Sequence, residues 1–368
     1  MKKLLVMLCA VFAGVPAVAN EFIVGQSIDL SGRTAEHGKA VQSGIELFIS
    51  SHKNAFGKNR IVLKTLDDGG DAKRAGANAQ RLIEKDKANV LFGGIEGGPC
   101  VAQLKVATEL KVPLIGCMGG APELRVPFNR YSFPVRAGHF TEFEQLLTYA
   151  KSNGLDKVAF VHADNDNGRS HLANVGKLTK KLGIADVISV PATAGADGKP
   201  DLRVMADRIV KAQAKGVFNH GSYVLYAELI RILRGTGKPI QIMAVNSGAQ
   251  QMIEALGNEG KGIIFTQVVP FPFSDSKPLV GEYRKALSAR NPKAQPSFSE
   301  LEGYMTAKAL AEGLKRATRP TTESIISAFE SLTNADIGGV VIRYGATAHD
   351  GADFVETVIA SSDGKFRR

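Results

Sequence analysis

The sequence predicts an α/β protein of two Rossmann-like lobes, with parallel central sheets joined by a multi-strand hinge. Short β-branched runs alternate with amphipathic helical stretches, which is the pattern of parallel sheets built from β-α-β units. Two such series follow one another along the chain. The stretch after Pro272 is rich in helices but lacks the strands for a sheet of its own, so we expect it to pack back on the first lobe.

The first series starts directly after residue 20. Val41, Ile45 and Phe48 recur at helical spacing and indicate the first amphipathic helix of this lobe. The expected strands cover residues 22–28, 61–66, 89–92 and 112–115, and the expected helices cover 38–51, 71–85 and 99–110.

The second series starts near His139 and ends at the proline-rich turn 270–273, a plausible crossover between lobes. Its expected helices are 139–152, 168–181, 202–215, 223–233 and 250–256, and its strands 157–161, 187–190, 216–219, 240–245 and 262–268. Helices at 278–290, 298–317 and 321–332 and strands at 340–344 and 354–360 follow. We assign residues 20–136 and 267–343 to lobe 1, and 137–266 and 344–368 to lobe 2.

The N-terminus has the pattern of an export signal. Lys2 and Lys3 precede an apolar stretch over residues 4–15, and a small-residue cleavage pattern ends at Ala19. The apolar run is too short to span a bilayer. We therefore predict a signal peptide over residues 1–19, cleavage after Ala19, and a periplasmic location.

The basic excess does not indicate a nucleic-acid surface. The chain has 46 Lys and Arg against 36 Asp and Glu, a formal charge of +10, but the basic residues are scattered among acidic ones. This interleaving is typical of solvated helix faces. A modest preference for anionic ligands remains open.

Cys100 and Cys117 each follow a predicted strand, and the two strands could be neighbours. An exported protein can oxidise such a pair, so a disulfide and two buried free thiols both stay open. The sequence contains no HExxH, Walker, GxSxG or strand-linked GxGxxG motif. The Asp164-x-Asp166 run fails as a calcium loop, because Arg169 stands where that loop needs glycine. We expect no metal and no cofactor.

Glycine-rich segments follow three strands of the first series, at residues 29–38, 93–99 and 116–123. Ligands of open parallel sheets collect at the carboxyl ends of strands, where glycine lets the backbone approach closely. The same glycines would also suit tight strand-to-helix turns. From these residues alone, the ligand-binding interpretation and the tight-turn interpretation both stay open.

Several motifs occur in the order found in the leucine/isoleucine/valine-type periplasmic binding proteins, and the chain resembles that family over nearly its whole mature length. The resemblance covers residues 27–32 with 36–38, 66–71, 82–86, 121–124, 164–168 and 299–304. It implies a type I periplasmic solute-binding protein of an ABC importer, whose lobes hinge shut on a small molecule before docking on a permease.

The resemblance also implies ligand contacts, carried over position by position. In the first lobe they fall on His37, Gly97, Gly98, Met118, Gly119 and Gly120, and in the second on Asn165, Asn167, Ser222, Tyr223 and Asn246. His37 matches an aromatic contact, Asn167 a contact tyrosine, and Asn246 the acid that pairs with a ligand ammonium.

The departures from the family pattern bear on the ligand. A buried ammonium needs a carboxylate partner, and Asn246 cannot provide one. Gly120 has no hydroxyl and Asn167 no aromatic face. We therefore expect a small polar solute without a free ammonium, rather than a simple branched-chain amino acid. Glu96 or Asp166 could replace the missing acid, or both could be solvated loop carboxylates.

The predicted protein is a monomeric, non-enzymatic receptor that binds a small-molecule solute and ABC permease subunits, and no nucleic acid. A ligand-sensing partner of a signalling receptor and an α/β enzyme of the periplasm are the alternatives. His37 and His220 both fall at strand-end loops, where a buried imidazole would make binding depend on pH.

Overall fold

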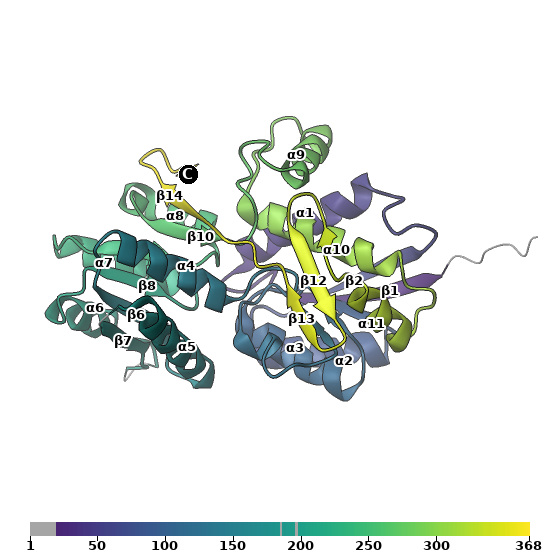
Figure 1. Cartoon of the computed structure of the whole chain (residues 1–368), viewed down its shortest axis with the longest axis horizontal. Coiled ribbons are helices and arrows are strands. Elements are labelled where there is room, and N and C mark those ends of the chain that lie inside the picture. The colour runs from purple at the N-terminus through teal and green to yellow at the C-terminus, as the bar shows by residue number, and fades with distance from the viewer. Residues whose placement is uncertain (1–19, 185, 196–197) are drawn as a thin grey trace, which may run out of the picture.

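The computed structural model describes residues 20–184, 186–195 and 198–368, so the predicted signal peptide and its cleavage site lie outside the described residues. Two lobes lie side by side, each with a central sheet covered by helices (Figure 1). The chain passes between them after β5, after β10 and after β13.

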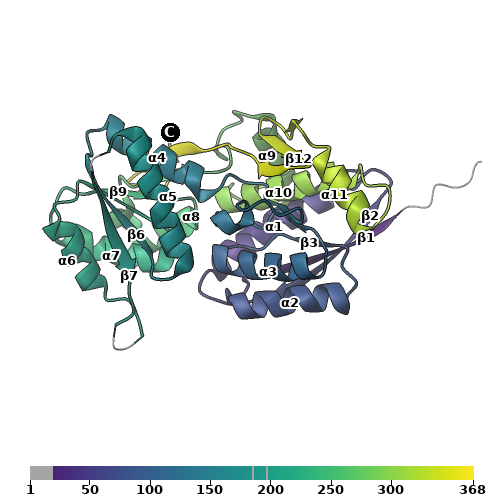
Figure 2. The ribbon, with the colours of Figure 1, turned by 60° about the horizontal axis from the view of Figure 1, so that its bottom comes forward.

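Lobe 1 contains a five-stranded parallel sheet in the order β2-β1-β3-β4-β5. The strands are β1 (Glu21–Ile28), β2 (Arg60–Asp67), β3 (Val90–Phe92), β4 (Leu114–Ile115) and β5 (Ser132–Phe133), the last not expected from the sequence. The helices are α1 (Ala35–Ser51), α2 (Ala72–Glu84) and α3 (Gly97–Glu109), with a 3₁₀ turn at Pro122–Leu124. Figure 2 shows α2 and α3 together on one face of this sheet.

The stretch after Pro272 packs on lobe 1, as its lack of strands indicated. It forms α9 (Pro278–Arg290), α10 (Phe298–Leu314) and α11 (Thr322–Glu330), and α10 lies along α1. Of the 17 residues of α10, 15 are buried, so this helix is covered on all sides.

Two glycines allow α1 and α10 to approach closely. A Cβ added to Gly44 would lie 1.8 Å from the Glu300 carbonyl oxygen, and one added to Gly303 would lie 2.0 Å from that of Val41. Any larger residue must therefore push the helices apart.

Lobe 2 contains a seven-stranded sheet in the order β15-β14-β10-β9-β8-β6-β7. Its parallel strands are β6 (Lys157–Ala163), β7 (Asp186–Ala192), β8 (Gly216–Asn219), β9 (Gln241–Ala244) and β10 (Ile264–Gln267). β14 (Glu356–Ala360) and β15 (Phe366–Arg367) form an antiparallel edge. The helices are α4 (His139–Ser152), α5 (Asp166–Leu182), α6 (Leu202–Lys211), α7 (Tyr223–Gly235) and α8 (Ala249–Leu256), followed by a 3₁₀ turn at Gly257–Gly260.

A small antiparallel sheet of β11 (Ala335–Asp336), β12 (Val341–Gly345) and β13 (Ala348–Gly351) packs on lobe 1. Tyr344 Oη donates to the Pro134 carbonyl at 2.8 Å, and the Ala352 N–H donates to that of Val135 at 2.8 Å. The last crossing therefore lies between β13 and β14, later than the boundary we placed after residue 343. The β12–β13 turn lacks the Asn-Gly or Asp-Gly signal of a hairpin, so the sequence did not indicate β13.

A buried ionic network lies where the first crossing joins the lobes. Arg136 Nη2 donates to Glu142 Oε2 on α4 of lobe 2, and Arg136 Nη1 lies 3.7 Å from Glu302 Oε1 on α10 of lobe 1. Asn246 connects both acids, because its backbone N–H donates to Glu142 Oε1 and its Nδ2 to Glu302 Oε2, each at 2.9 Å. All four residues are at most 4% exposed.

The ionised form of Glu142 is strongly favoured in this network. Burial alone would raise the pKa of its carboxyl, but Arg136 and a hydrogen bond from His139 outweigh burial and lower the pKa from 4.5 to about 2. The lobes are therefore tied together by a charge that stays ionised at neutral pH.

Replacing Gly44 with alanine should destabilise the protein by at least about 2 kcal/mol, because the new methyl group meets backbone that cannot move freely. Urea unfolding measures this change. Gly281→Ala on α9 is the matched control, since an added Cβ there meets nothing within 4 Å. It should gain about 0.5–1 kcal/mol from helix propensity. Equal effects of the two variants would contradict the close packing of α1 on α10.

The free energy of unfolding should also fall as the solution is acidified. The pKa of Glu142 is depressed in the folded protein, so its contribution is complete above about pH 4.5 and is lost as the pH falls towards 2. Glu142→Gln should cost about 3 kcal/mol at pH 7 and much less near pH 2.5, as urea unfolding at both pH values would show. Glu323→Gln, which breaks the exposed pair with Arg130, should change stability by less than about 0.5 kcal/mol. A cost of Glu142→Gln that does not depend on pH would refute this account.

Candidate ligand-binding cleft between the lobes

The carboxyl ends of the two parallel sheets meet at the junction of the lobes. The strand order reverses between β1 and β3 in lobe 1 and between β6 and β8 in lobe 2. Such switch points form the crevices in which open α/β sheets bind ligands. The loops that follow these four strands supply the candidate site.

A pocket of about 370 Å³ lies at the switch point of lobe 2. Residues that follow β6 and β8 line it, and Arg33 from the β1–α1 loop lines it from lobe 1. Its polar lining includes Arg33, His162, Asn165, Asn219, His220 and Ser222. Both lobes therefore contribute to one cavity of the size that binds small molecules.

Two helices begin at this pocket. Asn165 caps α5, its Oδ1 accepting from the Gly168 N–H at 3.0 Å, and Ser222 caps α7, its Oγ accepting from the Val224 N–H at 3.3 Å. A helix start carries N–H groups without intrahelical acceptors and a partial positive charge. Asn165 and Ser222 both line the pocket, and both are among the ligand contacts predicted from the sequence.

Tyr223 of lobe 2 lies close enough to lobe 1 for charged residues there to affect its hydroxyl. Its ring packs over Gly248, where an added Cβ would lie 2.3 Å from Tyr223 Cδ1, and the residue is 8% exposed. Burial raises the pKa of its hydroxyl, and the carboxylates of Glu36 and Glu96 raise it further. Both acids belong to lobe 1, so Tyr223 lies within electrostatic range of the facing lobe.

Gly97 and Asn167 are brought together across the lobe junction. A Cβ added to Gly97 would lie 4.0 Å from Asn167 Oδ1, and Asn167 Nδ2 donates to Glu123 Oε2 at 3.0 Å. Gly98 lies beside Gly97 and is exposed. The Asn167 amide is thus hydrogen-bonded to lobe 1 in this conformation.

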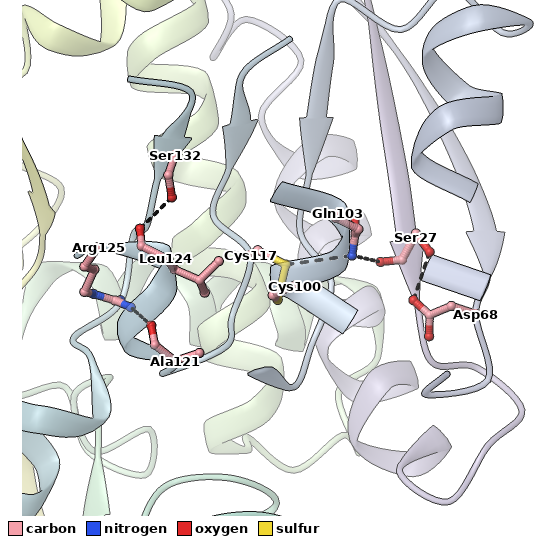
Figure 3. The surroundings of a disulfide bond; sticks show 9 residues. All are labelled: Ser27, Asp68, Cys100, Gln103, Cys117, Ala121, Leu124, Arg125 and Ser132. Carbon is pink, nitrogen blue, oxygen red and sulfur yellow. Dashed lines mark hydrogen bonds between the residues drawn. A yellow bond between two sulfur atoms is a disulfide. The ribbon is translucent and has the colours of Figure 1, made fainter. Parts of the chain in front are cut away.

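A disulfide joins Cys100 on α3 to Cys117 in the loop after β4, with 5.8 Å between their Cα atoms. This decides between the two states that the sequence left open. The bond ties the segment at Gly97 and Gly98 to the one at Met118–Gly120, and a Cβ on Gly119 would lie 3.2 Å from Cys100 Sγ. Figure 3 shows Gln103 beside the disulfide, donating to the Ser27 carbonyl at 3.3 Å.

Met118 and Gly120 lie away from the 370 Å³ pocket. Met118 is 4% exposed in the hydrophobic core, and its N–H donates to the Gly94 carbonyl at 2.9 Å. The His139 ring covers Gly120, because an added Cβ would lie 2.4 Å from His139 Cγ. Gly120 instead lines a second hollow of about 520 Å³, together with His171 of α5.

His37 and Asn246 lie at the junction of lobe and hinge. His37 Nδ1 lies 2.9 Å from Ser299 Oγ on α10. Burial, reinforced by Arg136, lowers the pKa of His37 from 6.5 to about 4, so its ring is neutral at neutral pH. Asn246 uses its amide on Glu302. Their role as ligand contacts remains a prediction.

Of the two acids considered as substitutes for the missing carboxylate, Glu96 lies within electrostatic range of the pocket residue Arg33. It precedes α3 with φ of 64°, an uncommon conformation for a residue other than glycine. Burial raises the pKa of its carboxyl, with Arg33 acting in the opposite direction. Asp166 is 99% exposed at its side chain and pairs with Arg169 at 2.5 Å.

Arg33 and Asn219 were not among the predicted contacts. Arg33 lies in the glycine-rich segment 29–38 that was singled out, but no family motif marks it. Asn219 is the last residue of β8 and looks like an ordinary strand position. Only the strand order, which places β8 beside β6, brings Asn219 to the pocket.

Among residues 20–184, 186–195 and 198–368, no three His, Cys, Asp or Glu side chains are arranged to hold a metal ion. No helix in these ranges combines the length and hydropathy needed to cross a bilayer.

Comparison with known proteins places these features in one family. The family model described as "Periplasmic binding protein" matches residues 22–359. A possible leucine/isoleucine/valine-binding protein from Rhodopirellula baltica is 25% identical, with a TM-score of 0.85 over 96% of this chain and 97% of that one.

Two further structures share the fold at lower identity. An extracellular ligand-binding receptor from Verminephrobacter eiseniae is 22% identical, with a TM-score of 0.84 over 95% of this chain and 100% of that one. A fatty acid ABC transporter substrate-binding protein from Thermomonospora curvata is 19% identical, with a TM-score of 0.81 over 96% and 92%. The resemblance drawn from the motifs is thus confirmed, and the chain belongs to the type I periplasmic binding proteins.

Proposed function

We propose that this protein is the solute-binding subunit of an ABC importer, which captures a small polar solute between its lobes and delivers it to a permease. The observation that carries this proposal is the pocket at the switch point of lobe 2, which Arg33 of lobe 1 completes. A ligand that contacts both of two hinged lobes shifts their equilibrium towards the closed arrangement.

The same geometry supports a receptor rather than an enzyme. Reversible capture needs complementarity to the solute itself, whereas catalysis needs groups that act on a transition state. The proposed protein is exported with a signal peptide over residues 1–19, cleaved after Ala19, and works as a monomer in the periplasm. The similar protein from Thermomonospora curvata is a fatty acid ABC transporter substrate-binding protein, which supports transport over sensing.

The solute is proposed to lack a free ammonium group. Asn246 offers no carboxylate, and its amide is already bound to Glu302. Proteins of this fold include a possible leucine/isoleucine/valine-binding protein and a fatty acid ABC transporter substrate-binding protein, so the fold does not fix the ligand. The pocket lining offers amide, hydroxyl, imidazole and guanidinium groups, together with the Asp164 carboxylate.

Solute capture can be tested on the mature protein. Mass spectrometry of small molecules released on denaturation should identify one bound polar solute, recovered chemically unchanged. Gly97→Phe should weaken its rebinding at least tenfold in titration calorimetry, because the new ring enters the space between Gly97 and Asn167.

Gly235→Phe is the matched control and should rebind normally, since Gly235 lies at the far end of α7 with no atom within 4 Å of an added Cβ. Turnover of the solute, or equal affinity of Gly97→Phe and the wild type, would overturn the proposal.

A further inference from the structure

We infer that the pocket between Arg33 and the strand ends of lobe 2 binds an anionic group of the solute, a carboxylate or a phosphate. This inference rests on the proposed function and specifies the chemistry of its ligand. The pocket is the cavity of about 370 Å³ already described.

Arg33 supplies the charge. It is exposed, and it forms no hydrogen bond or salt bridge with any residue of the described chain. Burial raises the pKa of the Glu96 carboxyl, and the Arg33 charge acts in the opposite direction. A guanidinium matches carboxylate and phosphate geometry, because its N–H groups can bind two oxygens at once. Arg33 is thus free to bind an anion when the lobes meet.

Two helix starts supply further positive potential on the opposite wall. α5 has 17 residues and α7 has 13, and each begins with a cap residue that lines the pocket. The caps accept hydrogen bonds only from the N–H groups of Gly168 and Val224. The N–H groups of Asp166 and Tyr223, at the first position of each helix, have no intrahelical acceptor. Such groups bind anions in many proteins.

Asn219 indicates, independently of Arg33 and the helix starts, that the pocket binds a ligand. The residue is 2% exposed and lines the pocket, yet its Oδ1 has no hydrogen-bond partner among the described residues. A buried polar atom left unpaired costs about 1–3 kcal/mol, so a bound ligand that completes its hydrogen bonding would regain part of that energy. No partner fixes which end of the amide faces the cavity, so its NH₂ can turn towards an anion.

His220 adds a neutral donor to the same wall. Its Nδ1 is buried without a partner, and its backbone N–H is used on the Val161 carbonyl at 2.8 Å. Burial lowers the pKa of His220 well below its usual value, so the ring is neutral and carries a single N–H. His162 is already satisfied, because Nδ1 lies 2.9 Å from the Ala163 carbonyl and Nε2 lies 2.9 Å from Ser189 Oγ.

The one carboxylate in the pocket lining is occupied elsewhere. Asp164 accepts from Thr193 Oγ1 at 2.9 Å and lies 3.8 Å from the Arg169 guanidinium. Its charge is therefore compensated within lobe 2. The groups left without partners around this pocket are a guanidinium, an amide, an imidazole and helix N–H groups, a set that selects an anion over a cation.

The test uses the mature protein freed of ligand and calorimetric titration at pH 7.5. Succinate and glycerol phosphate are the anionic probes, and succinamide and glycerol are their uncharged counterparts. At least one of the two anions should bind saturably, while its uncharged counterpart should not bind. Binding of succinate would identify the anionic group of the solute as a carboxylate, and binding of glycerol phosphate would identify it as a phosphate. Arg33→Gln should weaken that binding at least tenfold.

Arg208→Gln, on the exposed part of α6, removes the same charge outside the pocket and should bind like the wild type. Binding of neither anion, equal binding of an uncharged counterpart, or full affinity of Arg33→Gln would each overturn the inference. A released solute without an acidic group whose binding Gly97→Phe still abolishes would overturn it too, while leaving the proposed function intact.

Discussion

The arrangement of the two lobes depends on one buried charge, the Arg136 guanidinium. It is 2% exposed and lies between carboxylates that belong to different lobes, Glu142 on α4 and Glu302 on α10. A buried cation without its acids would be costly, so the first crossing is held where both acids can reach it. Because Asn246 closes this network after β9, the hinge and the strand ends of lobe 2 form one connected unit.

Around that hinge, covalent and steric constraints position the loops of lobe 1. The Cys100–Cys117 disulfide fixes the start of α3 against the loop after β4. Gly44 and Gly303 let α10 lie so close to α1 that the position of Glu302 is set by the same contact. The cleft loops therefore sit on a wall that has little freedom to adjust, and pre-organised loops lose less entropy when a ligand binds.

Periodicity was enough to predict the long elements and the two-lobed plan, because helices such as α2 and α6 have strong amphipathic patterns. It did not reveal β5, β13 or β15, which have two to four residues and too short a pattern to recognise. Motifs carried over from relatives found Asn165 and Ser222 in the pocket lining. They could not find Arg33 or Asn219, since these depend on which strands are neighbours and on how the lobes face each other.

The two walls of the cleft differ in how far their polar groups are already satisfied. On lobe 1, Asp29 accepts from the N–H groups of Gly32 and Thr34 and from the Thr34 hydroxyl, and Asp68 accepts from Ser27. These acids therefore already have hydrogen-bond donors within lobe 1. On the facing wall the buried Asn219 amide has no partner for its oxygen and can turn its NH₂ to the cavity, and Arg33 lines the same cavity without a salt bridge among the described residues. A ligand with an anionic group would accept hydrogen bonds from the Arg33 guanidinium and from the Asn219 NH₂, and would so contact both lobes at once, which favours their closed arrangement.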